Sequence, residues 1–357
     1  MRVLRFALMT SSDHRTQRSW IVWAGLILLT LVAGCAIPGQ GRINAALASE
    51  TGDAYFAAAT SVSAGLLLML VVALLTRPGR GTLRAVGPAF RRGDVRWWHL
   101  LAGCAGGYFV LTQTLTIGMI GVAVFTVAMV TGLTVGGLLW DRIGLGPGGR
   151  KRLNIFRIAG AVITVLAVIW AVSPQLEVTD QGWAWLLLVL LPFSGGFLNA
   201  GQQALNGRQT SAYGSPIPAT LFNFIFGTLV LLLAWGVKLL VAGPMPAAPP
   251  TEWWFYIGGP LGCVLIGLGA VLVTKVGVLL TAMGMIAGQL IGSLLLDLIL
   301  PAPGSLVTTA TVLGTLLTLV AVVVASVPDM RRGRCTSDHG SHCGTAAHES
   351  RSTTKMC

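Results

Sequence analysis

Apolar residues occur along almost the whole chain in runs of about 20, separated by short polar segments. A helical run of this length crosses the ~30 Å hydrocarbon layer of a bilayer. Each such run must be a helix, because unpaired backbone groups in lipid are costly. The pattern therefore predicts an all-α membrane protein with ten transmembrane helices, at 20–38, 55–76, 97–118, 122–140, 157–173, 183–203, 217–241, 253–274, 277–300 and 306–327.

The composition agrees with this class. Hydrophobic residues make up 54% of the chain and charged residues only 10%, against about 25% charged residues in soluble domains. The eleven tryptophans fall near the ends of the predicted spans, where indole rings meet the lipid headgroups. The net charge of +12 does not indicate nucleic acid binding, because the cationic residues lie in the loops and tails. The lipid bilayer is the expected partner.

The positions of Lys and Arg predict the orientation. If the spans alternate in direction, 22 of the 24 Lys and Arg lie on one side, and only Arg42 and Lys238 lie on the other. By the positive-inside rule both termini are cytoplasmic, and the Arg-, Ala- and Gly-rich composition is typical of bacteria, which predicts the inner membrane. The expected organisation is a basic cytoplasmic tail (1–19), a five-helix unit (20–173), an external linker (174–182), a second five-helix unit (183–327) and a disordered cytoplasmic tail (328–357).

The two halves of the chain are similar in sequence. A shift of 162 residues places Gly34, Gln40 and Asn44 on Gly196, Gln202 and Asn206, and a shift of 156 places Trp97-Trp98 on Trp253-Trp254 and Asp141 on Asp297. Each half has five predicted spans, an odd number, so the second half enters the membrane upside down. The predicted fold is a 5+5 inverted-topology repeat, which is typical of transporters although channels use it too.

Several motifs carry a family resemblance. They are Gly-(x)5-Gln-(x)3-Asn at 34–44 and 196–206, SPIPATLFNFIFGTLVLLL at 215–233, the paired tryptophans, and GQLIGSLLLD at 288–297. Over roughly residues 20–327 the chain resembles the putative inner-membrane exporter family, a branch of the drug/metabolite transporter superfamily built from five-helix units, single or fused. The resemblance implies ten helices in a 5+5 inverted repeat and the export of a small molecule. It does not imply a substrate.

Amide side chains in the spans are the candidate binding residues. Polar groups within membrane helices are costly and often functional. The pairs Gln40/Asn44 and Gln202/Asn206 each share one helix face. Elsewhere the repeat symmetry fails, and a substrate is generally asymmetric: Gln289 stands opposite Leu133, Asn223 opposite Ser61, and Gln113 lies in a span whose counterpart is apolar. We expect these side chains to line a central uncharged cavity; the alternative is that they hold helices together.

Glycine rows predict close helix contacts. Gly132 and Gly136 in the fourth span and Gly288 and Gly292 in the ninth have small-xxx-small spacing, which lets backbones approach. Because the two rows are repeat-equivalent, we expect these two spans to pack against each other and to form the moving interface.

Two carboxylates lie at repeat-equivalent span ends. Asp141 is expected on the cytoplasmic side and Asp297 on the external side. A carboxylate at a helix carboxyl end calls for a cationic neighbour, which suggests two alternating gates, Asp297–Arg42 outside and Asp141–Arg208 inside. The alternative is ordinary solvation at the membrane interface.

Other chemistry is not indicated. The spans contain no mid-span Glu, no Walker motif and no cluster of catalytic groups, so no cofactor and no enzymatic activity are expected. The carboxyl tail carries Cys335, His339, His342, Cys343, His348 and Cys357 without the spacing of a closed metal site, so no metal site is predicted. The favoured function is a secondary transporter, an exporter of a small organic metabolite or drug that works by alternating access. The alternative is an ion channel or facilitator pore. The sequence does not indicate the oligomeric state.

Overall fold

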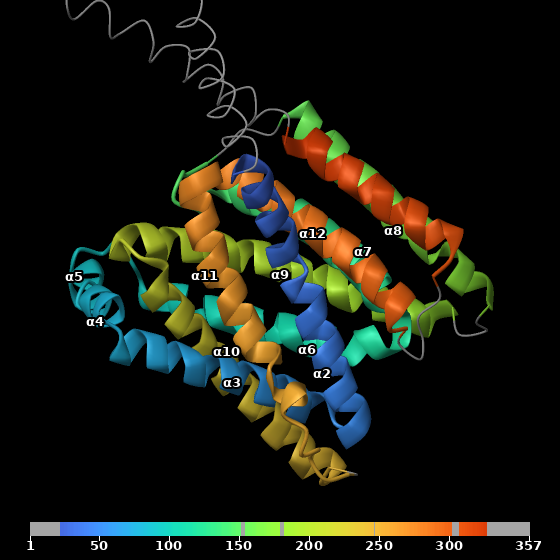
Figure 1. Ribbon diagram of the computed structural model, residues 1–357, viewed down its shortest axis with the longest axis horizontal. Coiled ribbons are helices and arrows are strands. Elements are labelled where there is room, and N and C mark those ends of the chain that lie inside the picture. The colour runs from blue at the N-terminus through green and yellow to red at the C-terminus, as the bar shows by residue number, and fades with distance from the viewer. Residues whose placement is uncertain (1–21, 151–153, 179–181, 246, 302–306, 327–357) are drawn as a thin grey trace, which may run out of the picture.

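The computed structural model describes residues 22–150, 154–178, 182–245, 247–301 and 307–326. Within these residues every regular element is a helix (Figure 1). A helix lies in each of the ten predicted ranges. The predicted tails at 1–19 and 328–357, with the Cys and His residues of the second, lie outside the described residues.

The elements follow one another with short connections. Residues 22–34 are helical and lead through a turn at Cys35 into α2 (Ala36–Thr51). The following elements are α3 (Ala54–Leu75), α4 (Arg77–Leu83), α5 (Val86–Arg91), η1 (Trp97–Leu101), α6 (Ala102–Ile120), α7 (Val122–Ile143), α8 (Ile155–Val178), α9 (Gly182–Tyr213), α10 (Pro216–Ala242), η2 (Trp253–Tyr256), α11 (Gly258–Val276) and α12 (Val278–Ile299). The last described helix spans Thr309–Ser326.

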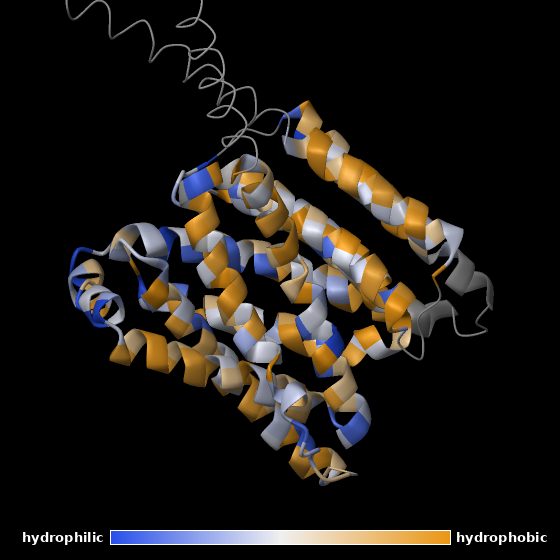
Figure 2. Ribbon diagram, in the orientation of Figure 1, coloured by the Kyte–Doolittle hydropathy of each residue, from blue (hydrophilic) through white to orange (hydrophobic). Residues whose placement is uncertain are grey.

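Seven of these helical stretches are long and apolar enough to cross a membrane. They are Val22–Thr51, Ala54–Leu75, Trp97–Ile120, Val122–Ile143, Pro216–Ala242, Leu280–Ile299 and Thr309–Ser326; Ile155–Ala171 and Gly258–Val273 are shorter apolar helices. Figure 2 shows apolar residues along the outer helices, such as α3, α11 and the last helix, and hydrophilic residues gathered around α4 and α5. The molecule is thus an all-helical membrane protein, as predicted.

The first helical stretch is longer than its predicted range. The prediction ended it at residue 38, because Pro38 and Gly39 disfavour a continuing helix. The structure instead breaks the helix at Cys35 and restarts it at Ala36. Pro38 then lies in the first turn of α2, where its missing N–H has no intrahelical partner to lose.

Helix α9 continues ten residues beyond its predicted end. The sequence after residue 203 is polar, but Leu205, Gln209 and Tyr213 are all buried. These residues are four apart and share one face of the helix. The Gln209 Nε2 donates a hydrogen bond of 3.0 Å to the carbonyl oxygen of His99 in η1. The extension is therefore held by tertiary contacts on one side.

The glycine rows correct the predicted seam. A Cβ on Gly132 of α7 would overlap the carbonyl oxygen of Phe193 in α9, and a Cβ on Gly288 of α12 would overlap that of Leu31 in the first helix. The two rows therefore do not pack against each other, although α7 and α12 do touch. Equivalence by repeat was compatible with either arrangement, and the partner backbones decide it.

The partners of both seams complete the same pattern. Gly136 faces Phe197 and Gly292 faces Cys35, residues that are again 162 apart. Gly196 of α9 and Gly34 of the first helix return the contact to the carbonyl oxygens of Met129 and Met285. Each seam joins a helix of one half to a helix of the other, so the two halves are interleaved.

Other contacts obey the same symmetry. Gly103 of α6 packs on Asn223 of α10, and its equivalent Gly259 of α11 packs on Ser61 of α3. The α8 helix and the last helix run side by side (Figure 1). Gly160 of α8 lies against Ala321 and Ala325, while Gly314 of the last helix lies against Ala167 and Ala171. That last contact pairs a helix with its own repeat equivalent.

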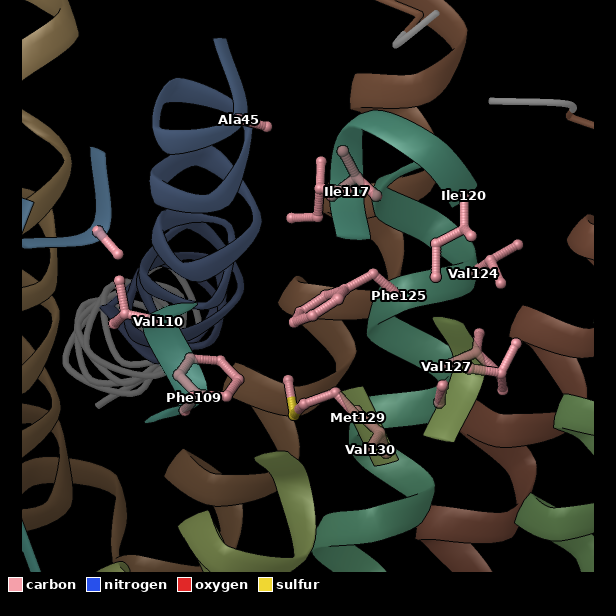
Figure 3. Close-up of a cluster of buried hydrophobic side chains, with 14 of the residues drawn as sticks. Ala45, Phe109, Val110, Ile117, Ile120, Val124, Phe125, Val127, Met129 and Val130 are labelled. Atoms are coloured by element: carbon pink, nitrogen blue, oxygen red, sulfur yellow. The ribbon is translucent and has the colours of Figure 1, made fainter. Parts of the chain in front are cut away.

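The core is centred on the amino-terminal half of α7. Residues 122–132 of this helix are all buried, which is expected of a helix that is apolar on every side. Figure 3 shows Phe109 of α6 beside Phe125 and Met129 of α7; the two phenyl rings lie 6.1 Å apart and are tilted. This core provides a rigid wall next to the cavity described below.

Candidate functional site

A cavity of about 460 Å³ lies between the two halves, bounded by α2, α3, α6, α7, α9, α10, α11 and α12. Its volume is within the range of small-molecule sites. Much of its wall is apolar, with Phe109, Val110, Leu265, Met285 and Ile286 among the lining residues. Among the described residues, no Asp, Glu, Lys, Arg or His lines it. The cavity can therefore solvate an apolar body but offers no counter-ion.

Seven amide side chains line the cavity. Five were predicted as binding residues, and Asn199 and Gln203 were not; the set is Gln40, Asn199, Gln202, Gln203, Asn206, Asn223 and Gln289. The structure thus brings together amides from α2, α9, α10 and α12. A binding role for them stays a prediction.

Four of the seven amides form a stripe along α9. Asn199, Gln202, Gln203 and Asn206 follow the i, i+3, i+4, i+7 spacing of one helix face. Within the stripe Gln203 donates from Nε2 to the Oδ1 of Asn199 at 2.8 Å. The repeat-equivalent positions of Asn199 and Gln203 are Ile37 and Gly41. This asymmetry was visible in the sequence, but only helical periodicity shows that the four residues act together.

Glycines bring the helices close to two of the amides. A Cβ on Gly106 of α6 would lie 2.5 Å from the Nε2 of Gln202, and a Cβ on Gly262 of α11 would lie 2.7 Å from the Oε1 of Gln40. The absence of side chains at these glycines leaves room for the amides at the cavity wall.

Three cavity amides have unsatisfied hydrogen-bonding atoms. The Oδ1 atoms of Asn206 and Asn223 and the Oε1 of Gln289 are buried and have no partner in the described structure. An unsatisfied buried polar atom costs about 1–3 kcal/mol. These amides are therefore positioned to gain from a ligand that hydrogen-bonds to them.

Gln113 and Asn44 lie elsewhere. Gln113 of α6 is fully buried and donates from Nε2 to the Ile37 carbonyl oxygen at 3.1 Å. This bond joins α6 to the first turn of α2, next to the break at Cys35. Asn44 is also fully buried. Neither residue lines the cavity, so the cavity is built without them.

Asp297 caps a helix. Its Oδ1 accepts from the backbone N–H of Val122 at 3.0 Å and its Oδ2 from that of Ala123 at 2.7 Å. A carboxylate at a helix amino terminus satisfies N–H groups that have no intrahelical partner and complements the helix dipole. The predicted ion pair with Arg42 is not formed: Arg42 donates instead to the carbonyl oxygens of Leu300 and Pro301.

Asp141 has a different cationic partner from the one predicted. Its Oδ2 lies 2.7 Å from the Nη1 of Arg157 at the start of α8. Arg208 is exposed on the far part of α9 and does not pair with it. The prediction was wrong because α9 extends beyond its expected end, which carries Arg208 away along the longer helix.

A buried ion pair escaped the sequence reasoning. Asp53, the N-cap of α3, lies 2.9 Å from the Nζ of Lys238 in α10 and accepts from the Trp235 indole at 3.2 Å. Burial alone would raise the pKa of Asp53, but the Lys238 ammonium, the Phe56 N–H and the indole together lower it below the ordinary value. The signal was a lone Lys in a long apolar helix, which requires a carboxylate partner.

The described residues contain no group of three or more His, Cys, Asp or Glu able to hold a metal ion. The Cys and His residues of the carboxyl tail are not among them.

Comparison with known proteins now adds to this geometry. A family model described as "Putative inner membrane exporter, YdcZ" matches residues 25–170 and again 187–324. The two matched segments correspond to the two halves found by self-comparison, as in a fused pair of units. No curated protein matches the chain.

Proposed function

Because this chain belongs to the putative inner membrane exporter family, we propose that it is a secondary transporter that exports a small, uncharged organic molecule by alternating access. The observation that carries the proposal is the amide-lined, charge-free cavity between two interleaved and symmetric halves. Membership of the family and the apolar helices support a membrane transporter; the substrate class and the mechanism are our inference.

The lining supports an uncharged substrate. A bare charge buried without a counter-ion pays a large desolvation cost, and the lining supplies none. Amide groups offer both donors and acceptors. A molecule with an apolar body and several N–H, O–H or carbonyl groups on one side fits this division between apolar wall and amides.

The matched contacts support alternating access. A pseudo-symmetric pair of seams lets one half adopt the contacts of the other, so the two end states have similar energies. We place ten helices across the membrane as a 5+5 inverted repeat, with both termini in the cytoplasm. The charge distribution of 22 cationic residues against 2 supports this orientation.

One end of the cavity is closed, which favours a transporter over a channel. The exposed side chain of Gln203 marks the open end. Toward the opposite end Asn44, Ser61 and Gly258 are buried. A pore would need a continuous polar path, and the described cavity does not continue past these residues.

The proposal is tested by ligand-induced stabilisation of the purified protein. Uncharged amphipathic compounds should raise the melting temperature in proportion to their affinity, and charged analogues of the same shape should not. Asn206→Leu should weaken binding about 5- to 150-fold, the equivalent of one lost hydrogen bond. The control Gln209→Leu on the same helix should lower stability and leave affinity unchanged. Tighter binding of the charged analogues would contradict the proposal.

A further inference from the structure

Two buried polar side chains outside the cavity have no hydrogen-bond partner. Asn44 of α2 is fully buried, and neither its Nδ2 nor its Oδ1 is paired; Ser61 of α3 is 1% exposed and its Oγ is also unpaired. Both converge on Gly258, the first residue of α11. A Cβ there would overlap the Asn44 Oδ1 and would lie 3.0 Å from the Ser61 Oγ.

Packing does not explain this cluster. Buried polar groups are nearly always hydrogen-bonded, and each unpaired one lowers stability by about 1–3 kcal/mol. An Ala at position 44 would avoid the whole cost of the amide. A buried amide with both atoms unpaired therefore indicates a partner that binds in another state of the protein.

The repeat identifies that state. The equivalent of Asn44 is Asn206 and the equivalent of Ser61 is Asn223, and both of these line the cavity. The surrounding contacts are equivalent as well: Gly106 meets Gln202 as Gly262 meets Gln40, and Gly103 meets Asn223 as Gly259 meets Ser61. The two ends therefore have the same construction, and only one of them is open.

We propose that Asn44 and Ser61, together with Gln40, form a second binding station for the same uncharged, hydrogen-bonding substrate. It opens between α2, α3 and α11 toward the opposite face of the membrane when the Asn206–Asn223 end closes. This inference rests on the proposed transport function and names the residues that the substrate meets as it leaves.

The cover over the second station is thin. Leu47 of α2, Ala57 of α3 and Phe255 of η2 form a small apolar cluster next to it. The chain enters α11 directly from η2, so a displacement of η2 and the start of α11 moves Phe255 and Gly258 together. Such a movement uncovers Asn44 and Ser61 without disturbing the core around α7.

Cysteine accessibility tests the station. In a background in which the native cysteines are replaced, Ser61→Cys and, separately, Asn44→Cys are treated with a membrane-impermeant maleimide from the external face of intact cells. Ala58→Cys, on the same helix and also fully buried, is the control, and Gln203→Cys reports the cytoplasmic end in inverted vesicles. Correct folding of each variant is checked by size-exclusion chromatography.

We expect the Ser61→Cys variant to be labelled from outside at least about tenfold faster than the Ala58→Cys control. Labelling of both Ser61→Cys and Asn44→Cys at the control rate, or only from the cytoplasmic side, would overturn the inference. The readout needs no substrate, so it is separate from the proposed function. If uncharged ligands bind in the stabilisation assay and neither variant is labelled, the station alone is wrong; if the variants are labelled and no ligand binds, the transport proposal is wrong.

Asn44→Ala gives an independent readout. Removing an unpaired amide should leave the melting temperature unchanged or raise it, and should lower transport about tenfold through the loss of one binding contact. A structural amide would show the reverse, with lower stability and normal transport by the folded protein.

Discussion

Single amides in this protein have two distinguishable roles. Gln289 faces the cavity with an unpaired oxygen, whereas Gln113 is bound to the Ile37 carbonyl. Both stood out in the sequence for the same reason, a polar residue where the other half has an apolar one. Sequence alone could not separate them, because the difference lies in which backbone passes beside each side chain.

Replacing these two residues with leucine should therefore have opposite consequences. Gln289→Leu should weaken ligand binding by about 1–3 kcal/mol, roughly 5- to 150-fold, with normal folding. Gln113→Leu should lower the melting temperature, since the Ile37 carbonyl loses its donor, and the surviving protein should bind normally. Titration of ligand against thermal stability measures both. Loss of affinity in the Gln113 variant alone would reverse the assignment.

The Asp53–Lys238 pair predicts a dependence of stability on pH. Because the pKa of Asp53 is lowered in the folded state, its stabilising effect is complete above its ordinary value of 3.8 and is lost as the pH falls through the lower, folded value. Asp53→Asn should be less stable than the wild type at neutral pH, because it leaves the ammonium of Lys238 without its carboxylate. The difference should shrink below about pH 4. A constant difference down to about pH 2 would show that the charge of Asp53 does not matter.

Between helices, the decisive contacts are backbone against backbone. Small-xxx-small spacing correctly marked the tight rows on α7 and α12. The partner helices were assigned wrongly, since each row lies under carbonyl oxygens of α9 or of the first helix. The signal for the correct partner was present in Gly34 and Gly196, which lie on the facing helices and were recognised only as part of a motif.

Two glycines on α7 make a matched test of this seam. A Cβ on Gly132 would overlap the Phe193 carbonyl oxygen, whereas nothing lies within 4 Å of a Cβ on Gly137. Gly132→Ala should therefore destabilise the protein and block transport, because a backbone must move. Gly137→Ala should be neutral or stabilise the helix by up to about 1 kcal/mol. Melting temperature and transport, measured on both, decide; equal behaviour would place the seam elsewhere.

The cap that Asp297 forms on α7 is a second contact between helices. Asp297→Ala should lower stability by about 0.5–2 kcal/mol, the usual effect of losing an N-cap. Asp297→Asn keeps one acceptor oxygen and should lose less. Because Arg42 binds the carbonyl oxygens of Leu300 and Pro301, Arg42→Gln combined with Asp297→Ala should give nearly additive losses in denaturation experiments. Strong coupling between the two would restore the direct pair that the sequence suggested.

At the scale of the whole molecule, the helices and the duplication could be predicted from the sequence, and their arrangement could not. Apolar runs placed a helix in every expected range, and the shifts of 162 and 156 residues reappear as matched contacts. The cavity was anticipated in its chemistry, but Asn199 and Gln203 were missed because they lack equivalents in the first half. Sequence similarity identifies what the halves share, while the site is formed largely by what they do not share.

The inverted arrangement of the two halves predicts one specific topology. Reporter fusions after Ala85, Gly148 and Cys335 should be cytoplasmic, and a fusion after Val178 should be external. Ala85 lies in the basic segment between α4 and α5, Gly148 follows α7, and Val178 ends α8, so each fusion tests a different crossing. The excess of cationic residues on one side sets the expected orientation. Paired cytoplasmic and periplasmic reporters measure it at each position. An external Gly148 fusion would mean that α6 and α7 do not both cross, and the two halves could not then be inverted copies that exchange conformations.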